Sequence, residues 1–277
     1  MLLAAFCHDI DHPGTSQNYE IATLSTLALR HNDSAILERH HAHTAFSLLQ
    51  KPECNILDGF SREEYRECRK VIIHAILGTD MSKHFTIVSQ LSRKAADLSK
   101  ELLQQKEETS CDSSFWKRSR TDHRRTSTEN MRRMFALERS VTDVGSQGDI
   151  VALPFKREKD EDRIQLIECV VHSADLVAQT APYETARQWG DRVVEEFTNE
   201  AAKFKQAGLE EHTPLFMTQL ETEYDKMKLQ SSFVANIVLP LWENMHELLG
   251  GLDTPLANLR SNLRAYETSV SNLMPSG

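Results

Sequence analysis

The sequence has little of what marks secreted, membrane-spanning or strand-rich proteins. Its 277 residues include five cysteines, an odd number with no CxxC pair. Such usage is typical of reduced thiols, so we expect a cytoplasmic protein. No apolar run approaches the roughly 18 residues that a membrane-spanning helix needs. No segment of any length alternates apolar and polar residues as a half-buried strand does. These absences favour an all-α protein without a membrane span.

An excess of positive charge is also lacking. The formal net charge is −9, from 41 acidic and 32 basic residues, and no long basic stripe occurs outside the middle of the chain. We therefore expect no nucleic-acid partner. Hydrophobic residues make up 40% of the sequence, which is enough to build a sizeable core in one large domain.

What is present is helical periodicity of apolar residues. Ser61 and Glu64 form a capping-box pattern, which marks the start of a helix. Asn32-Asp33-Ser34 is interpreted as a break and N-cap, and Pro240 is expected to kink the helix that contains it. The expected fold is a compact multi-helix bundle. Its predicted helices cover 17–30, 34–50, a segment after Ser61, 85–105, 162–175, 183–206, 216–227, 230–249 and 253–268.

One short stretch concentrates groups that bind metal ions. His8-Asp9-Ile10-Asp11-His12-Pro13-Gly14 holds two histidines and two aspartates within five positions. His8 and His12 are four residues apart, so they share a face if a helix continues to Pro13, where we expect it to end. Imidazole with carboxylate suits zinc or another divalent first-row metal, and carboxylate with water suits magnesium. A polar helix end packed against the domain is the alternative interpretation.

This stretch resembles the HDxDHPG motif of the class I 3′,5′-cyclic-nucleotide phosphodiesterases. Further motifs of that family follow in the family's order, over nearly the whole chain. The resemblance implies a partial catalytic domain over 1–277 with an all-α, HD-type fold that acts in cyclic-nucleotide signal transduction. The further motifs are Asn32-Asp33 with Leu37-Glu38-Arg39-His40-His41, Thr79-Asp80-Met81-Ser82-Lys83-His84, His172-Ser173-Ala174-Asp175-Leu176, Gln188-Trp189-Gly190-Asp191-Arg192, Gln230-Ser231-Ser232-Phe233 and Pro240-Leu241-Trp242-Glu243.

The activity implied is hydrolysis of cyclic AMP or cyclic GMP to the 5′-monophosphate at a site with two divalent ions. By resemblance, His8, Asp9 and Asp175 hold the first ion, normally zinc. Asp9 also bridges to the second ion, normally magnesium or manganese. A carboxylate such as Asp175 at the end of an apolar helix is costly unless it is paired or binds metal, which favours the same role. The residues implied to order the surrounding waters or to hold the general acid are His12, Glu38, His41 and Thr79.

The resemblance also implies a pocket for the nucleotide base. Gln230 would hydrogen-bond the purine edge, Phe233 would stack on the base, and Val193 would help to clamp it. Ala178 stands where cyclic-AMP-selective members carry a polar residue, so the preference between cyclic AMP and cyclic GMP stays open. His172, three residues before Asp175, is expected to pack against it or to support it.

The family's HNxxHxxD motif, which supplies the general-acid histidine and another zinc ligand, is not found in this sequence. We expect that motif and its helices upstream of Met1, and we identify no general acid within the chain. One alternative function is therefore a catalytically silent helical protein, truncated or regulatory. Another is a different HD-type metal phosphohydrolase. Gln230 and Phe233 argue against the second alternative, since such an enzyme needs no purine clamp.

Residues 107–160 differ in composition from the rest of the chain. Between 112 and 140 there are eight Lys or Arg against four Asp or Glu, with little apolar periodicity. Such a segment buries too little apolar surface to order itself, so a mostly disordered surface insertion is predicted. Arg124-Arg125-Thr126-Ser127 has the RRxS form of basophilic kinase sites, which makes Ser127 a candidate for phosphorylation. Chance occurrence is the alternative there.

A first prediction concerns the missing motif. Without a positioned acid, the 3′ oxygen must leave as an alkoxide, so residues 1–277 should hydrolyse cyclic nucleotides about 10²–10⁴-fold more slowly than a version extended upstream. Both purified proteins would be compared at saturating cyclic AMP and cyclic GMP. Equal rates would contradict the prediction.

Overall fold

The structure is a computed structural model that describes residues 1–113, 155–156 and 158–274. Every regular element in those ranges is helical, which confirms the all-α prediction. None of the helices in the described part of the chain combines the length and hydropathy that crossing a membrane requires. Most of the predicted insertion, including Ser127, lies outside the described residues. Helix α6 continues as far as Ser113, a few residues into that segment.

The first part of the chain forms one group of packed helices. The helices Leu2–Cys7, Ile36–Leu49 and Arg62–Leu77 share a core cluster to which Val171 also contributes from a helix much later in the chain. The elements of this group are α1 (Leu2–Cys7), α2 (Gln17–Ala22), α3 (Thr26–His31), α4 (Ile36–Leu49), η1 (Pro52–Cys54), α5 (Arg62–Leu77) and η2 (Met81–Lys83).

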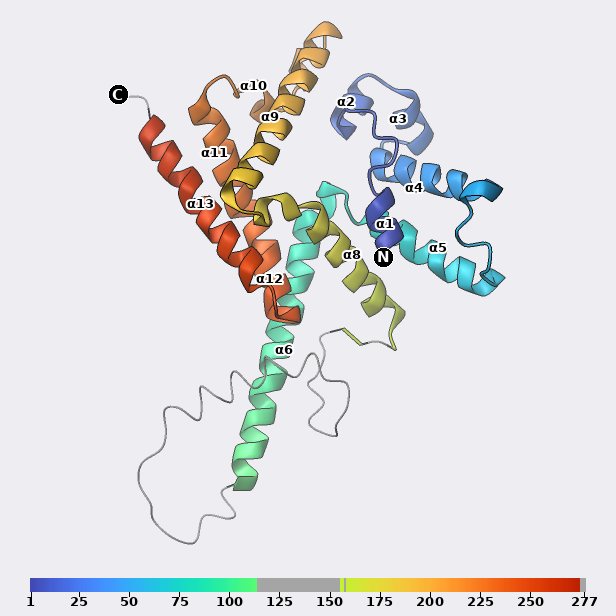
Figure 1. Cartoon of the computed structure of the whole chain (residues 1–277), viewed down its shortest axis with the longest axis vertical. Helices are drawn as coiled ribbons and strands as arrows, with labels where there is room; N and C mark the ends of the chain where they lie inside the picture. The colour runs from blue at the N-terminus through green and yellow to red at the C-terminus, as the bar shows by residue number, and fades with distance from the viewer. Residues whose placement is uncertain (114–154, 157, 275–277) are drawn as a thin grey trace.

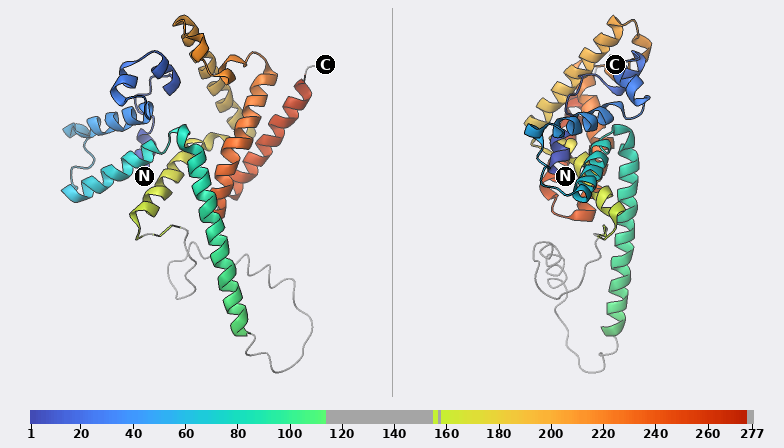
Figure 2. Two further views of the ribbon diagram at one scale, coloured as in Figure 1. Left: turned by 180° about the vertical axis from the view of Figure 1, so that it is seen from behind. Right: turned by 90° about the vertical axis from the view of Figure 1, so that its right-hand side faces the viewer.

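The later elements build a second core cluster around large buried side chains such as Leu241, Leu259 and Tyr266. Figure 1 shows α1–α5 on one side of the molecule and α9–α13 on the other, with α6 and α8 between them; Figure 2 shows the same from behind. The elements are α6 (His84–Ser113), α8 (Asp160–Asp175), η3 (Val177–Thr180), α9 (Tyr183–Gln206), η4 (Glu210–His212), α10 (Leu215–Thr218), α11 (Glu223–Phe233), η5 (Val234–Val238), α12 (Leu239–Leu249) and α13 (Asp253–Leu273).

Helix α8 joins the two cores. Cys169 is buried in the second cluster, whereas Val171 is buried in the first. The last residue of α8, Asp175, therefore lies where the two groups of helices meet, and its position is fixed from both sides.

Three predicted helices are wrong in their extent. The predicted helix 216–227 is divided between α10, which ends at Thr218, and α11, which runs from Glu223 to Phe233. The helix expected to run to Pro13 ends at Cys7, and Asp11 adopts a left-handed φ of 60°. His8 and His12 are therefore loop residues and do not share a helical face. The predicted helix 17–30 is split into α2 and α3 because Leu24 is left-handed and the Ser25 hydroxyl caps α3, accepting from Ala28 N at 3.1 Å.

Of the two helix caps predicted from the sequence, one is present and the other is not. The capping box of Ser61 and Glu64 is present at the start of α5. Asn32, however, is the left-handed C-cap of α3 and does not begin α4.

The helix around Pro240 is not simply kinked. A π-helical turn, η5, precedes Pro240 and connects α11 to α12. Because proline has no N–H to donate, it breaks the regular α-helical ladder, and a wider π turn accommodates the break. The turn follows Phe233 directly, so it sets how that end of α11 faces its surroundings.

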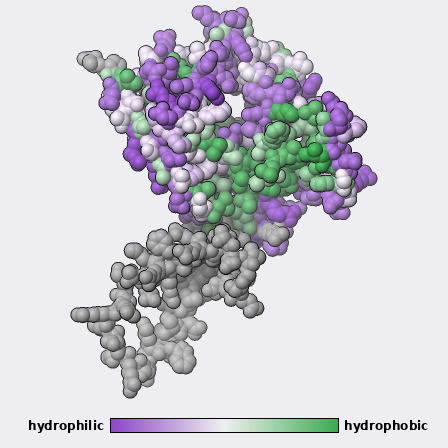
Figure 3. All heavy atoms as spheres, viewed as in Figure 1, coloured by the Kyte–Doolittle hydropathy of each residue, from purple (hydrophilic) through white to green (hydrophobic). Residues whose placement is uncertain are grey.

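Apolar surface is also exposed. Figure 3 shows hydrophobic residues gathered over the face where α1, α5 and α8 meet. Leu2 and Phe6 of α1 are 82% and 86% exposed. Exposed apolar surface of this kind promotes association in solution.

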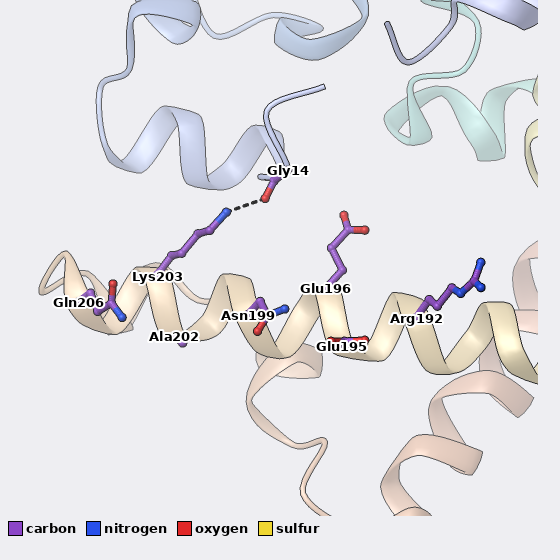
Figure 4. Close-up of a pocket in the computed structure, with 8 residues that line it drawn as sticks. All are labelled: Gly14, Arg192, Glu195, Glu196, Asn199, Ala202, Lys203 and Gln206. Atoms are coloured by element: carbon purple, nitrogen blue, oxygen red, sulfur yellow. Dashed lines mark hydrogen bonds between the residues drawn. The ribbon is translucent and has the colours of Figure 1, made fainter. Parts of the chain in front are cut away.

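The loop after His12 is tied to α9 across the molecule. Glu200 is only 3% exposed, and its carboxylate accepts hydrogen bonds from the backbone N–H of Ser16 (2.8 Å) and from the Ser16 hydroxyl. Lys203, one turn further along α9, donates to the carbonyl of Gly14 at 2.8 Å, above an open groove of about 530 Å³ on α9 (Figure 4). These bonds hold the segment that carries His8 and His12 against α9.

A second prediction tests this connection. Glu200→Ala should lower the free energy of unfolding by about 1–3 kcal/mol, because it removes a buried carboxylate and leaves the half-buried Ser16 groups without that acceptor. Glu195→Ala, on an exposed position of the same helix, is the matched control and should change stability by less than about 0.5 kcal/mol. Denaturant unfolding measures both, and equal effects of the two substitutions would argue against the connection.

Candidate functional site

Three side chains converge at the junction of α1, its following loop and α8. The Nε2 atom of His8 lies 3.0 Å from Asp175 Oδ1 and 3.3 Å from Asp9 Oδ2. One ligand atom from each of the three residues fits within 4.8 Å of the others. One imidazole nitrogen and two carboxylate oxygens are donors that suit zinc or another divalent first-row cation. The three residues predicted as metal ligands are thus together.

The orientation of His8 is set from behind. Its Nδ1 atom lies 2.8 Å from the carbonyl of Ala5, so Nδ1–H donates there and Nε2 faces the carboxylates. Hydrogen bonds to Asp175 and then to Asp9 raise the pKa of His8 to about 11. The hydrogen bond with His8 in turn lowers the pKa of Asp9. The two carboxylates therefore favour a positive charge at the position of the His8 ring.

A cavity of about 450 Å³ opens from this cluster. The side chain of Glu38 lies in its wall, and its buried Oε2 atom has no hydrogen-bond partner in the protein. Burial raises the pKa of Glu38 to about 7. An unpartnered carboxylate oxygen in an acidic cavity fits a site that takes up cations and ordered water. The other acidic and histidine residues in the wall are Asp9, His12, His41, Asp80, Asp175, Glu196 and Glu200.

Two histidines form part of the same wall. His41 is almost fully buried, and its Nδ1–H donates to the carbonyl of Ile10 at 2.7 Å. This leaves Nε2 directed toward Asp9, 3.8 Å from Oδ1. His12 stacks on His41 with ring centroids 5.6 Å apart. Burial lowers the pKa of His41, so its ring is neutral and accepting at Nε2 near neutral pH.

Thr79 reaches the cavity through a close approach of α8 to the end of α5. Its hydroxyl donates to the carbonyl of Ile76 at 2.8 Å, which leaves the oxygen free to accept from a ligand in the cavity. A Cβ on the preceding residue, Gly78, would lie 3.1 Å from Glu168 of α8. The glycine therefore permits the packing that brings Thr79 and Asp175 to one cavity.

A second cavity, of about 630 Å³, adjoins the first. It is lined by the three predicted base-binding residues, Gln230 and Phe233 of α11 and Val193 of α9. Asp175 lines both cavities, and its side chain is 28% exposed. The carboxylate at the end of this apolar helix therefore opens onto the cavities and is not enclosed by the core.

Gln230 is held in a defined orientation. Its Nε2 atom donates to the carbonyl of Gly190, and its Oε1 atom accepts from Gln179 Nε2, both at 3.3 Å. A Cβ on Gly190 would lie 2.7 Å from Gln230 Cδ, so any other residue there would displace the Gln230 amide. Sequence reasoning assigned no role to Gly190 or Gln179. A glycine inside a helix, where it costs about 1 kcal/mol relative to alanine, was the available signal of a close approach.

The comparisons with known proteins agree with this geometry. A profile of the family described as 3′5′-cyclic nucleotide phosphodiesterase matches residues 1–259. The chain belongs to this family. The resemblance seen in the motifs is therefore confirmed.

Relatives in this family extend beyond the length of this chain. It is 29% identical over 270 residues to the probable 3′,5′-cyclic-AMP phosphodiesterase pde-4 of Caenorhabditis elegans and to 3′,5′-cyclic-AMP phosphodiesterase 4C of Rattus norvegicus. Each match covers 97% of this chain, but only 32% and 40% of the relatives. The chain thus spans about a third of the length of the curated relatives that it matches.

Solved structures show the same fold. The phosphodiesterase domain of the RhoPDE fusion protein from the choanoflagellate Salpingoeca rosetta superposes with a TM-score of 0.72 at 25% identity. The match covers 98% of this chain and 68% of that chain. A second structure, of the phosphodiesterase domain of rhodopsin phosphodiesterase from the same organism, gives the same TM-score and identity, covering 65% of that chain.

A third prediction follows from the environment of Glu38. Its pKa is about 7 in the folded protein against 4.5 normally, so the folded state binds a proton that the unfolded state has released between these values. The free energy of unfolding should therefore fall as pH rises from about 4.5 to above 7. With a chelator added to remove metal ions, the Glu38→Gln variant should not show this loss. Between pH 4.5 and pH 8 its free energy of unfolding, relative to that of the wild type, should rise by about 1–3 kcal/mol. Glu67→Gln, at an exposed position on α5, is the control. A stability difference between Glu38→Gln and the wild type that is the same at both pH values would refute the raised pKa of Glu38.

Proposed function

We propose that the chain hydrolyses 3′,5′-cyclic nucleotides to 5′-monophosphates at the cluster of His8, Asp9 and Asp175. The observation that carries this proposal is that Asp175 lines both cavities. A cluster of metal-ligand type and a pocket lined by an aromatic ring and an amide are therefore contiguous. A cyclic nucleotide, which has an anionic phosphodiester at one end and a flat base at the other, matches that arrangement.

We propose that the phosphate end lies over the acidic cavity. Zinc held by His8, Asp9 and Asp175, and magnesium or manganese held by Asp9, would supply activation of water and neutralisation of the phosphate charge. The hydrogen bond from His8 Nδ1–H to Ala5 keeps Nε2 available as a ligand. His12, Glu38, His41 and Thr79 would orient water around the ions, since each of them lines this cavity.

The base end would enter the second cavity. Phe233 offers a ring for stacking, Gln230 an amide for the directional contact, and Val193, at 38% exposure, an apolar edge. Cyclic AMP is the first substrate to test, because the relatives from nematode and rat are named as cyclic-AMP phosphodiesterases. Cyclic GMP is the alternative, since Ala178 has no polar group with which to read the base.

Two other functions are weighed against this one. A catalytically silent protein of the same family would keep the second cavity without turnover. A different HD-type metal phosphohydrolase would need the acidic cavity alone. The packing of Gln230 against Gly190 and Gln179 supports a purine-binding role and disfavours that second alternative.

A fourth prediction addresses the metal cluster. Asp175→Ala should reduce bound zinc and abolish hydrolysis, because it removes one of three ligands from a dication site. Asp191→Ala, at an exposed position on α9, is the control and should leave both unchanged. Metal content by mass spectrometry and rates with cyclic AMP are the measurements. Full metal content and full activity in Asp175→Ala would overturn the assignment.

A fifth prediction addresses the base pocket. Gln230→Ala should weaken nucleotide binding by about 1–3 kcal/mol with little change in metal content, because it removes a hydrogen bond to the base and not to the phosphate. Titration with a non-hydrolysed cyclic nucleotide measures the affinity. Unchanged affinity would mean that the base does not bind beside Gln230.

A further inference from the structure

Two buried histidines lie behind the acidic cavity, and the proposed function gives them no role. His84 is the first residue of α6 and is 1% exposed, and His172 lies in the last turn of α8 and is 0% exposed. His84 Nδ1 lies 2.9 Å from His172 Nε2, with the two rings tilted by 43°. One nitrogen of this contact carries the proton and the other accepts it.

The pair joins two segments that line the acidic cavity. On one side, His172 precedes Asp175 by three residues and therefore lies on the same face of α8. On the other side, His84 follows η2, whose N-cap Asp80 accepts from the backbone N–H of Ser82 at 2.8 Å. Thr79, Asp80 and Asp175 all line the cavity. The hydrogen bond between the imidazoles thus connects the carboxylate of α8 to the turn that carries Thr79 and Asp80.

Burial keeps this connection neutral. Desolvation lowers the pKa of His172 to about 4 and also lowers the pKa of His84. The negative charges of Asp175 and Asp80 act in the opposite direction on the pKa of His172 but do not outweigh burial. A hydrogen bond between two imidazoles requires that they are not both protonated, so a neutral pair is the state that holds the two segments together.

We propose that His84 and His172 are positioning residues that hold Asp175 at the distance from Thr79 and Asp80 that cation binding requires. Ligands supplied by separate helices bind a cation well only when their separation is fixed in advance, and partners behind the ligands commonly provide this. An apolar pair would fill the same space but would set no directional distance. The inference rests on the proposed phosphodiesterase function, because it assigns a role within the same site.

Zinc affinity and turnover are measured for variants that keep, displace or remove the polar atom through which each histidine makes this contact. In His84→Asn and His172→Gln the amide places a polar atom near the position of the lost ring nitrogen, Nδ1 or Nε2. His84→Gln places it one bond too far, and His172→Phe removes it. His74→Phe is the matched control, since it breaks another contact to α8, with Glu168 at 3.1 Å, on an exposed surface.

We expect His172→Phe and His84→Gln to weaken zinc binding by about 10–100-fold and to lower kcat with KM nearly unchanged. His172→Gln, His84→Asn and His74→Phe should stay within about threefold of the wild type. Zinc affinity that is equal in His84→Gln and His84→Asn, both folded by circular dichroism, would overturn the inference. Should His172→Phe fail to fold, the two His84 variants decide the outcome alone. A wild-type protein that binds zinc without turning over cyclic nucleotides would instead defeat the proposed function, and the zinc affinities would still test the pair.

Discussion

The contact of His8 with Asp175 joins two residues that are 167 positions apart, and the rest of the site depends on it. Two carboxylates, with further acids in the same cavity wall, are brought close to one imidazole. Carboxylates this close to one another repel unless a positive charge lies between them. A proton on the His8 ring supplies such a charge, and the hydrogen bonds to Asp175 and then to Asp9 raise the pKa of His8 to about 11. A dication supplies it better, and in the proposed function it takes the place of the proton.

The framework around this contact explains why it is maintained. Helix α8 is buried in both core clusters, so Asp175 cannot move with either group of helices alone. The loop that carries His8 and Asp9 is tied to α9 through Glu200 and Ser16. Helix α9 also supplies Val193 to the second cavity. The same elements thus position the acidic cluster and the adjoining pocket. The simplest interpretation is that one elongated anionic ligand occupies both.

Much of the site could be predicted from the sequence because family motifs carry it. Asp9, Asp175, Gln230 and Phe233 line one or both of the two adjoining cavities, and His8 contacts Asp175, although their roles remain predictions. The helices that the periodicity predicted best are those with long apolar stripes, such as α9, whose bounds of 183–206 match the structure. The all-α fold class was predictable for the same reason.

Other features depend on the backbone or on long-range contacts, which periodicity does not report. The loop conformation of Asp11 and the break at Leu24 arise from left-handed residues in segments where the sequence predicted continuous helix. The Ser25 cap was a local signal that could have located the second break. The pairing of His84 with His172, and of Gln230 with Gly190, joins residues 88 and 40 positions apart. Only the packed structure brings these residues together.

The central claim is that His8, Asp9 and Asp175 form one dication site beside a nucleotide pocket. The most direct measurement is anomalous diffraction at the zinc edge from crystals grown with zinc and the 5′-monophosphate product. The account predicts a zinc peak about 2.0–2.2 Å from His8 Nε2 and from an oxygen of each aspartate, with the base density between Phe233 and Val193. A zinc peak elsewhere, or a base bound away from Gln230, would contradict it.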